Sequence, residues 1–271
     1  MSLLWSTTDG DGNVFAYFEA SQYGLGVDYG GETAHGNRLA KYNAAGQLVW
    51  LLPWPRDDRF IGDVSGNLIG VTTGDAASVF GCATMSMSSS GLYLQKFDET
   101  GSCTWGKDFG GSLSEGAIDS DDAGNIYVAA VVSGTVDFGD GPLSPIGTQD
   151  IVLAKLSPNG DPIWSGRFGG EAFTGTVSLS VAGNGQVLVG GHFDGALDLG
   201  AGPLLAAGGA SFIAKLDQAG ALVGLHQFSG TFRFAADPGG DALLMSDDTS
   251  LDLGEGAVFT TGGLAVAKLR L

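Results

Sequence analysis

The chain has 271 residues, of which 44% are hydrophobic, enough for one large domain with a substantial core. The formal net charge is −18 with only 12 basic residues, which argues against binding to nucleic acid or to anionic membranes. There is no apolar run of 18 residues and no leader pattern at the start, so we expect neither membrane insertion nor a signal peptide in this sequence. The 47 glycines follow no Gly-X-Y period, which excludes collagen and indicates many tight turns.

A fivefold internal repeat organises the chain. A lysine that ends an apolar run recurs at intervals of 55, 59, 60 and 53 residues. Nine residues after three of these lysines stands a tryptophan, and thirteen residues after four of them stands another aromatic residue. Two fixed offsets of this kind indicate repeated structural units. The register residues are Lys41, Lys96, Lys155, Lys215 and Lys268, then Trp50, Trp105 and Trp164, then Trp54, Phe109, Phe168 and Phe228.

Each unit contains four short apolar runs separated by turn residues. In the third unit they cover roughly 116–120, 126–132, 151–156 and 162–168. Short runs rich in Val, Ile and aromatic residues, bounded by Gly, Asn and Asp, are typical of β-strands. Four antiparallel strands per unit, repeated radially, predict an all-β fold, a five-bladed β-propeller. The blades of this single domain, residues 1–271, are then approximately 1–55, 56–111, 112–170, 171–230 and 231–271.

The ends of the chain leave the closure of the ring open. Trp5 lies only eight residues before Asn13, which places Leu3–Ser6 on the first strand of the first blade. The last blade then has three strands, either as such or because the chain was cut from a longer array. In the alternative, the strand at Leu3–Ser6 completes the last blade. Exposed strand edges promote aggregation, so one of these closures has to operate.

The motifs of the third unit resemble a known repeat. They are Asp121-x-x-Gly-Asn-Ile-Tyr-Val, Gly-Thr-Val-Asp-Phe-Gly, Ala-Lys-Leu and Trp164 followed by Phe168-Gly-Gly. With them the unit resembles the bacterial β-propeller repeats called SBBP, above all the glycine-rich versions in secreted or lipid-anchored myxobacterial proteins. The resemblance implies a propeller and an extracellular or cell-envelope location in a bacterium. It implies no reaction, because the family is defined by its scaffold.

The aspartate of the Thr-x-Asp-Phe-Gly type recurs along the chain. We expect it to pair with the lysine of its own blade or to cap a turn, because a half-buried charge needs a partner. Lys96 tests the pairing, since Val79 replaces the acid in that unit. The recurring aspartates are Asp28, Asp137, Asp198 and Asp252.

One segment has the spacing of a calcium loop. Asp9, Asp11 and Asn13 alternate as calcium ligands do, but Val14 and Ala20 stand where an EF-hand needs Gly and Glu. Because the segment coincides with the first hairpin of the repeat, a turn explains it. We therefore expect no metal and no cofactor.

The two cysteines are a candidate disulfide. Cys82 and Cys103 fall in the same unit, and no other unit has a cysteine. A bridge between them fits an oxidising compartment. The alternative is two small buried thiols.

The connections from each fourth strand to the next first strand differ between blades, unlike the repeated aromatic residues, which we expect to pack between blades. These connections are candidates for a polar ligand site at the mouth of the central channel, the alternative being solvated loop charge. The candidate residues are Arg56, Asp57, Arg59, Glu115, Glu171 and Arg233.

These observations favour a monomeric, non-catalytic binding or adhesion module of a bacterial secreted or surface protein, with a glycan or a protein as its ligand. One alternative is a structural spacer excised from a larger surface protein. Another is a glycoside hydrolase that uses paired carboxylates such as Glu115 and Glu171. Because no nucleophile-elbow, zinc-protease or phosphate-loop motif occurs, we expect no enzyme activity and name no catalytic residue.

Overall fold

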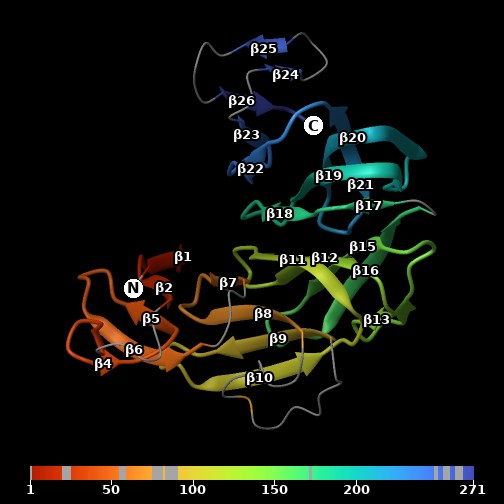
Figure 1. The fold of residues 1–271 in the computed structure, drawn as a ribbon. Helices are drawn as coiled ribbons and strands as arrows, with labels where there is room; N and C mark the ends of the chain where they lie inside the picture. Colours follow the sequence, from red (N-terminus) through yellow and green to blue (C-terminus); the bar gives the residue numbers. More distant parts are fainter. Residues whose placement is uncertain are drawn as a thin grey trace. The chain divides into compact units, whose positions relative to one another are not determined.

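The computed structural model describes residues 2–19, 26–54, 59–74, 82, 91–170, 173–246, 250–252, 257–259 and 265–271. These residues form antiparallel β-sheets and contain no helix, which confirms the all-β prediction (Figure 1). No helix able to cross a membrane therefore exists in this part of the chain. The chain divides into two compact units, Met1–Gly110 and Gly111–Leu271.

The first unit contains two four-stranded sheets of consecutive strands. Because β1 pairs with β2, Leu3–Ser6 lies on the first strand of the first sheet, as the spacing of Trp5 predicts. The first sheet consists of β1 (Ser2–Thr8), β2 (Val14–Glu19), β5 (Arg38–Tyr42) and β6 (Leu48–Pro53), with the small hairpin β3 (Val27–Asp28) and β4 (Thr33–Ala34) between its second and third strands. The second sheet consists of β7 (Arg59–Gly62), β8 (Leu68–Gly74), β9 (Gly91–Phe97) and β10 (Cys103–Asp108).

The second unit contains the third, fourth and fifth sheets. The third and fourth are joined where Gly169 of β16 pairs with Asp198 of β19. The third sheet consists of β11 (Leu113–Ser120), β12 (Ile126–Val132), β15 (Asp150–Leu156) and β16 (Pro162–Gly169), with the hairpin β13 (Val136–Asp137) and β14 (Pro142–Leu143). The fourth consists of β18 (Ser178–Val181), β19 (Val187–Asp198), β20 (Pro203–Leu216) and β21 (Leu222–Phe228), with β17 (Thr174–Gly175) beside β19. The fifth has three strands, β22 (Arg233–Ala236), β23 (Ala242–Ser246) and β26 (Ala265–Leu269), and β24 (Ser250–Asp252) pairs with β25 (Ala257–Phe259).

The middle strands are buried on both faces, which explains why they are continuous apolar runs. All seven residues of β12 and all seven of β15 are buried. We call the side of each sheet that carries the repeated lysine its lysine face. In the first sheet this face carries Phe15, Lys41 and Trp50, and it packs against Phe60 and Phe97 of the second sheet.

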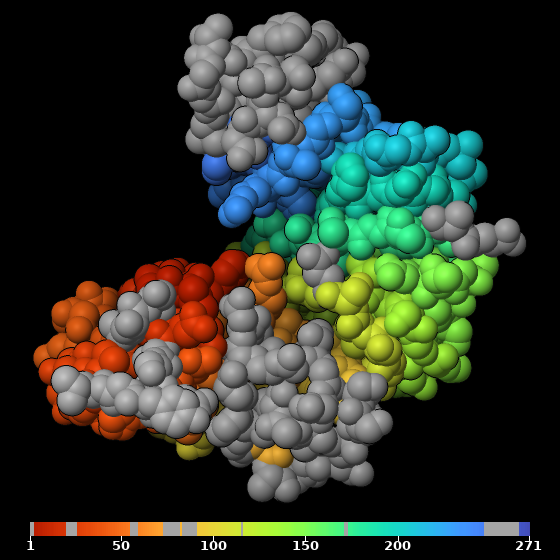
Figure 2. All heavy atoms as spheres, viewed as in Figure 1, coloured from red at the N-terminus to blue at the C-terminus, as the bar shows by residue number. Residues whose placement is uncertain are grey.

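The same stacking recurs in the second unit. The third sheet packs on the fourth, and the fourth packs on the fifth around Leu188, Ile213 and Leu244. Figure 2 shows the blue atoms of the fifth sheet directly against the cyan atoms of the fourth. The lysine face of the fifth sheet is different, because Met245 and Val266 on it are 43% and 66% exposed.

The hairpins share one five-residue turn. The first residue accepts hydrogen bonds from the backbone N–H groups of the third and fifth residues, as Asp63 does from Ser65 and Asn67. The fourth residue is a glycine with positive φ, +79° at Gly66, which only glycine adopts without strain. The Asp-x-x-Gly-Asn pattern of the repeat is therefore a turn signal.

Candidate functional site

Four repeated lysines are neutralised by the first residue of the hairpin between the first and second strands of their own sheet. The lysine Nζ lies within 4 Å of an aspartate oxygen in each case, and three of these lysines are nine-tenths buried or more. The pairs are Lys41 with Asp9 at 3.4 Å, Lys96 with Asp63 at 2.9 Å, Lys155 with Asp121 at 3.6 Å, and Lys268 with Asp237.

The expected pairing of the lysine with the Thr-x-Asp-Phe-Gly aspartate is therefore wrong, because the hairpin aspartate is the partner instead. Lys96 is as well anchored as its counterparts although Val79, which lies outside the described residues, replaces the Thr-x-Asp-Phe-Gly aspartate. That aspartate caps a turn instead, the other expected role, because Asp28 Oδ1 accepts the N–H groups of Gly30 and Gly31. Asp137 and Asp198 make equivalent bonds to glycine N–H groups, and the side chain of Asp252 lies outside the description.

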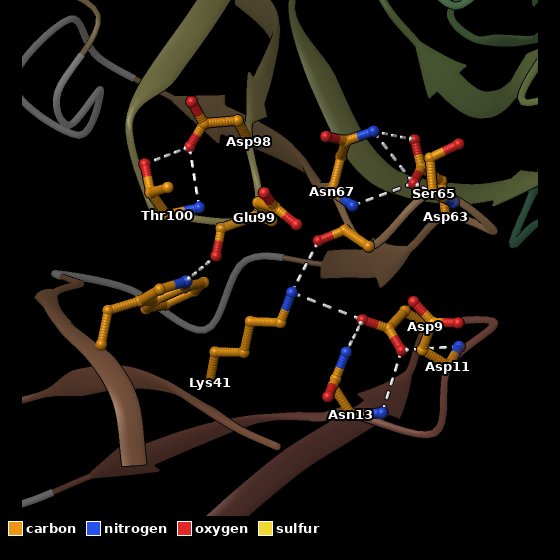
Figure 3. A network of polar contacts seen from close by, with 12 residues as sticks. Asp9, Asp11, Asn13, Lys41, Asp63, Ser65, Asn67, Asp98, Glu99 and Thr100 are labelled. Carbon is orange, nitrogen blue, oxygen red and sulfur yellow. Dashed lines mark hydrogen bonds and ion pairs between the residues drawn. The ribbon is translucent and has the colours of Figure 1, made fainter. Parts of the chain in front are cut away.

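One of these ion pairs also links two neighbouring sheets. Nζ of Lys41 also donates to the carbonyl of Gly66 in the second sheet at 2.8 Å (Figure 3). Burial alone would raise the pKa of Asp63, but hydrogen bonds from Asn67 and the neighbouring Lys96 outweigh it and hold that pKa below its ordinary value. Asp63 is therefore a structural anion at neutral pH.

The calcium-like segment is a turn, as predicted. Asp9 Oδ1 accepts the N–H groups of Asp11 and Asn13, Oδ2 accepts the Asn13 amide, and Lys41 lies beside it (Figure 3). Because its oxygens are engaged in this way, Asp9 is a turn residue. Within the described ranges, no group of three or more acidic, His or Cys side chains could hold a metal ion.

Two of the repeated tryptophans hydrogen-bond to the neighbouring sheet. Nε1 of Trp50 donates to the carbonyl of Glu99 at 3.1 Å, and Nε1 of Trp164 donates to the carbonyl of Gln218 at 3.0 Å. Each ring lies on a glycine of the neighbouring hairpin, where a Cβ would come within 3.0–3.2 Å of it. These tryptophans pack between sheets, as expected.

The structure describes three of the six candidate residues of the connections. Arg56, Asp57 and Glu171 lie outside the described residues. The other three are in strands: Arg59 in β7, Glu115 in β11 and Arg233 in β22. Glu115 was predicted in a loop, but it pairs with Val131 because β11 begins before the first apolar residue of the run.

The cysteines form the disulfide that their shared unit suggested. Cys82 is bonded to Cys103, with Cα atoms 5.5 Å apart, within the range that a bridge requires. Cys82 is 8% exposed and packs in the same cluster as Trp54 and Phe97. The bridge therefore ties the first residue of β10 to the core between the first and second sheets.

A different group of residues stands out between these two sheets. Trp54 and Gln95 are 2% and 1% exposed, yet the indole N–H of Trp54 and both amide atoms of Gln95 have no hydrogen-bond partner among the described residues. The two side chains are neighbours, because Gly70 pairs with Gln95 and a Cβ on Gly70 would lie 3.3 Å from the Trp54 ring. Buried polar atoms without partners are rare in native proteins.

Residues nearer the surface lie next to this pair of side chains. Phe60 pairs with Gly70 on the side away from Gln95, and its carbonyl accepts the indole N–H of Trp5 at 3.3 Å. The Arg59 guanidinium lies over the Trp5 ring, 4.9 Å from its centroid, and Trp5 is 38% exposed. We call Trp5, Trp54, Arg59 and Gln95 the Trp54–Gln95 site.

The sequence contained a signal for this site that our reasoning did not use. Aligning the units on their lysines places Gln95 where the other four units have alanine: Ala40, Ala154, Ala214 and Ala267. The same alignment places Trp54 where the next three units have phenylalanine. The two departures from the repeat thus face one another across one interface.

No protein-family model matches this sequence, and no curated protein matches it either. Among solved structures, the chain is similar to a protein of unknown function from Dyadobacter fermentans, with 12% identity over 98% of this chain and 77% of that one and a TM-score of 0.48. It is also similar to an ulvan lyase of polysaccharide lyase family PL25, with 9% identity, coverage of 95% and 72%, and a TM-score of 0.48. Because both TM-scores are below 0.5, these similarities decide neither the detailed fold nor the function.

Proposed function

We propose that the chain is a non-catalytic glycan-binding module of a bacterial secreted or surface protein, built on a five-bladed β-propeller of the SBBP-like kind. The observation that carries the binding role is the set of unpartnered polar atoms at the Trp54–Gln95 site. An unsatisfied buried polar group costs about 1–3 kcal/mol. Alanine and phenylalanine occupy the equivalent positions in other units, so the scaffold does not require the polar groups. Gln95 and Trp54 therefore weaken the fold unless a ligand hydrogen-bonds to them.

A sugar suits the chemistry of the site. A carboxamide donates and accepts at once, which matches a hydroxyl group, and the indole N–H supplies a second donor. Trp5 and Arg59, both exposed, offer an aromatic ring and a cation nearer the surface of the same site. The ligand we propose stacks at Trp5 and inserts a hydroxyl group toward Gln95.

The proposed ring closes through the lysine face of the fifth sheet. The other four repeated lysines are buried, whereas the Lys268 side chain is 45% exposed beside Leu243 and Met245. A closed chain of this length has a radius of gyration of about 18 Å. Small-angle scattering of a monomeric solution tests this, and a markedly larger radius would refute closure.

The ligand proposal is tested with two variants that restore the repeat. Wild-type protein is screened on a glycan array, and the affinity of the best glycan is measured by calorimetry for wild type, Trp54→Phe and Gln95→Ala. Each variant removes one or two hydrogen bonds, so we expect each to bind about tenfold more weakly. Both are expected to be at least as stable as wild type, which separates lost binding from lost folding.

Arg270→Ala is the matched control, because Arg270 is exposed on the other unit, is not among the candidate ligand residues, and is expected to leave the affinity unchanged. If no glycan binds wild type, the glycan-binding proposal is wrong and the alternative of a structural spacer is favoured. Undiminished binding by both variants would instead place the ligand elsewhere on the molecule.

A further inference from the structure

Lys215 of the fourth sheet lacks the partner that the equivalent lysines have. It is 7% exposed, the same as Lys96 and Lys155. The position that supplies Asp9, Asp63, Asp121 and Asp237 in the other sheets is Ala182 here. In the described part of the chain no carboxylate oxygen lies within 4.0 Å of its amine, and no hydrogen-bond acceptor is found for it either.

The hairpin that carries Ala182 nevertheless keeps the shape of the others. The Ala182 N–H donates to the Gln186 carbonyl at 2.9 Å, and the Gly185 N–H donates to the Ala182 carbonyl at 2.7 Å. Gly185 has φ +80°, against +77° at Gly12 in the first sheet. The backbone therefore presents residue 182 as it presents the aspartates, and only the carboxylate is missing.

Neighbouring groups do not take its place. The N–H of Asn184, which corresponds to the N–H groups that donate to the aspartates, has no acceptor among the described residues. The Oε1 atom of Gln186 accepts from the Asn184 amide instead of from Lys215. Leu271 lies against Gly224, the strand neighbour of Lys215, without an ion pair to the amine.

We propose that the fourth sheet binds a small monovalent anion, chloride or a one- or two-carbon carboxylate, between the Lys215 amine and the hairpin 182–186. Lys215 is only 7% exposed, so water can replace a counterion of its ammonium group only in part, and the protein shows four times how it neutralises the equivalent group. Ala182 is 3% exposed, so the position of the missing carboxylate lies inside the protein and admits only a small ion. The anion takes the place of the aspartate side chain.

The test is thermal unfolding of the full chain at constant ionic strength, with sodium gluconate replaced stepwise by sodium chloride, formate or acetate. An ion that binds only the folded protein raises the melting temperature with concentration, by ~5–11 °C near a hundredfold excess over its dissociation constant. Gluconate is too large for the site and serves as the reference. Comparing the three anions distinguishes chloride from a small carboxylate as the preferred ligand.

Ala182→Asp is the decisive variant, because it supplies the carboxylate from the chain. It is expected to melt above wild type in gluconate and to lose the response to the small anions. Ala182→Ser, which adds a hydroxyl group but no charge, is the control and should still respond. ³⁵Cl line broadening that wild type shows and Ala182→Asp lacks would report chloride binding directly.

The proposal is overturned if wild type melts at the same temperature in all four salts, or if Ala182→Asp responds to the small anions as strongly as wild type does. Lys215→Met tests the amine itself and should abolish the response. If that variant does not fold, the comparison of Ala182→Asp with Ala182→Ser still decides the question.

Discussion

Removing the indole of Trp50 tests whether the repeated tryptophan holds neighbouring sheets together. In Trp50→Ala the second sheet loses the ring that lies on Gly101 and the donor to the Glu99 carbonyl. The ring also packs against Phe15, with centroids 5.8 Å apart. All of these contacts lie within the first unit, so the expected effect is on the packing between the first and second sheets.

The magnitude follows from burial. Trp50 is 8% exposed, and a buried tryptophan removes about 150–250 Å² from water. At about 25 cal/mol per Å² this area corresponds to about 4–6 kcal/mol, an upper bound because the unfolded chain already hides part of it. We therefore expect Trp50→Ala to lower the free energy of unfolding by about 3–5 kcal/mol, in line with other buried aromatic truncations.

The assay is urea denaturation followed by far-UV circular dichroism, which does not depend on tryptophan fluorescence. Trp50→Phe keeps most of the apolar area and loses the hydrogen bond, so it should cost less than Trp50→Ala. Trp164 makes the same bond but is only half-buried, so Trp164→Ala should cost less as well. A loss below about 1 kcal/mol for Trp50→Ala would refute the packing role, since burial would then not govern stability there.

Three further predictions concern other contacts. Asp63→Asn removes the carboxylate with which the Lys96 amine forms its ion pair and should cost about 3–5 kcal/mol at pH 7. Because folding lowers the pKa of Asp63, this difference from wild type should shrink in urea titrations as the pH falls below about 4. Burial raises the pKa of Asp119, so its charged form opposes folding at higher pH, and Asp119→Asn should raise the melting temperature at pH 7 but not at pH 3. The Cys82→Ser/Cys103→Ser double variant opens a loop with a sequence separation of 21 and should lose about 3 kcal/mol in urea denaturation.

The strand pattern could be predicted from the sequence because the physical signals are local. Apolar runs bounded by glycine and asparagine predicted the strands of the third unit, and β12 and β15 lie within a residue of the predicted ranges. The turns were equally visible, because an Asp-x-x-Gly-Asn segment satisfies its own backbone. What local signals cannot give is the partner of a side chain that crosses between strands or sheets.

The lysine pairs illustrate that limit. Spacing alone offered two aspartates per unit, and we chose the one in the connection between the second and third strands. The hairpin aspartate is closer in space because Lys155 lies opposite Tyr127 at the start of β12, next to the hairpin of Asp121, whereas Asp137 follows the other end of β12. Register between strands therefore decides the partner, and register is a property of the folded sheet.

The candidate loop charges were chosen because they do not recur, and the same criterion applied inside the sheets would have found Gln95. The repeat acts as an internal control: alanine before the lysine and aspartate in the hairpin are what the scaffold uses elsewhere. Gln95 adds buried polar atoms without partners, and Ala182 removes the carboxylate partner of a mostly buried lysine, so each departure leaves a polar group without a partner among the described residues. For a spacer, Gln95→Ala and Ala182→Asp would improve stability and change nothing else. For a binding protein each would also remove a ligand, so measuring binding and stability on the same two variants separates the two functions.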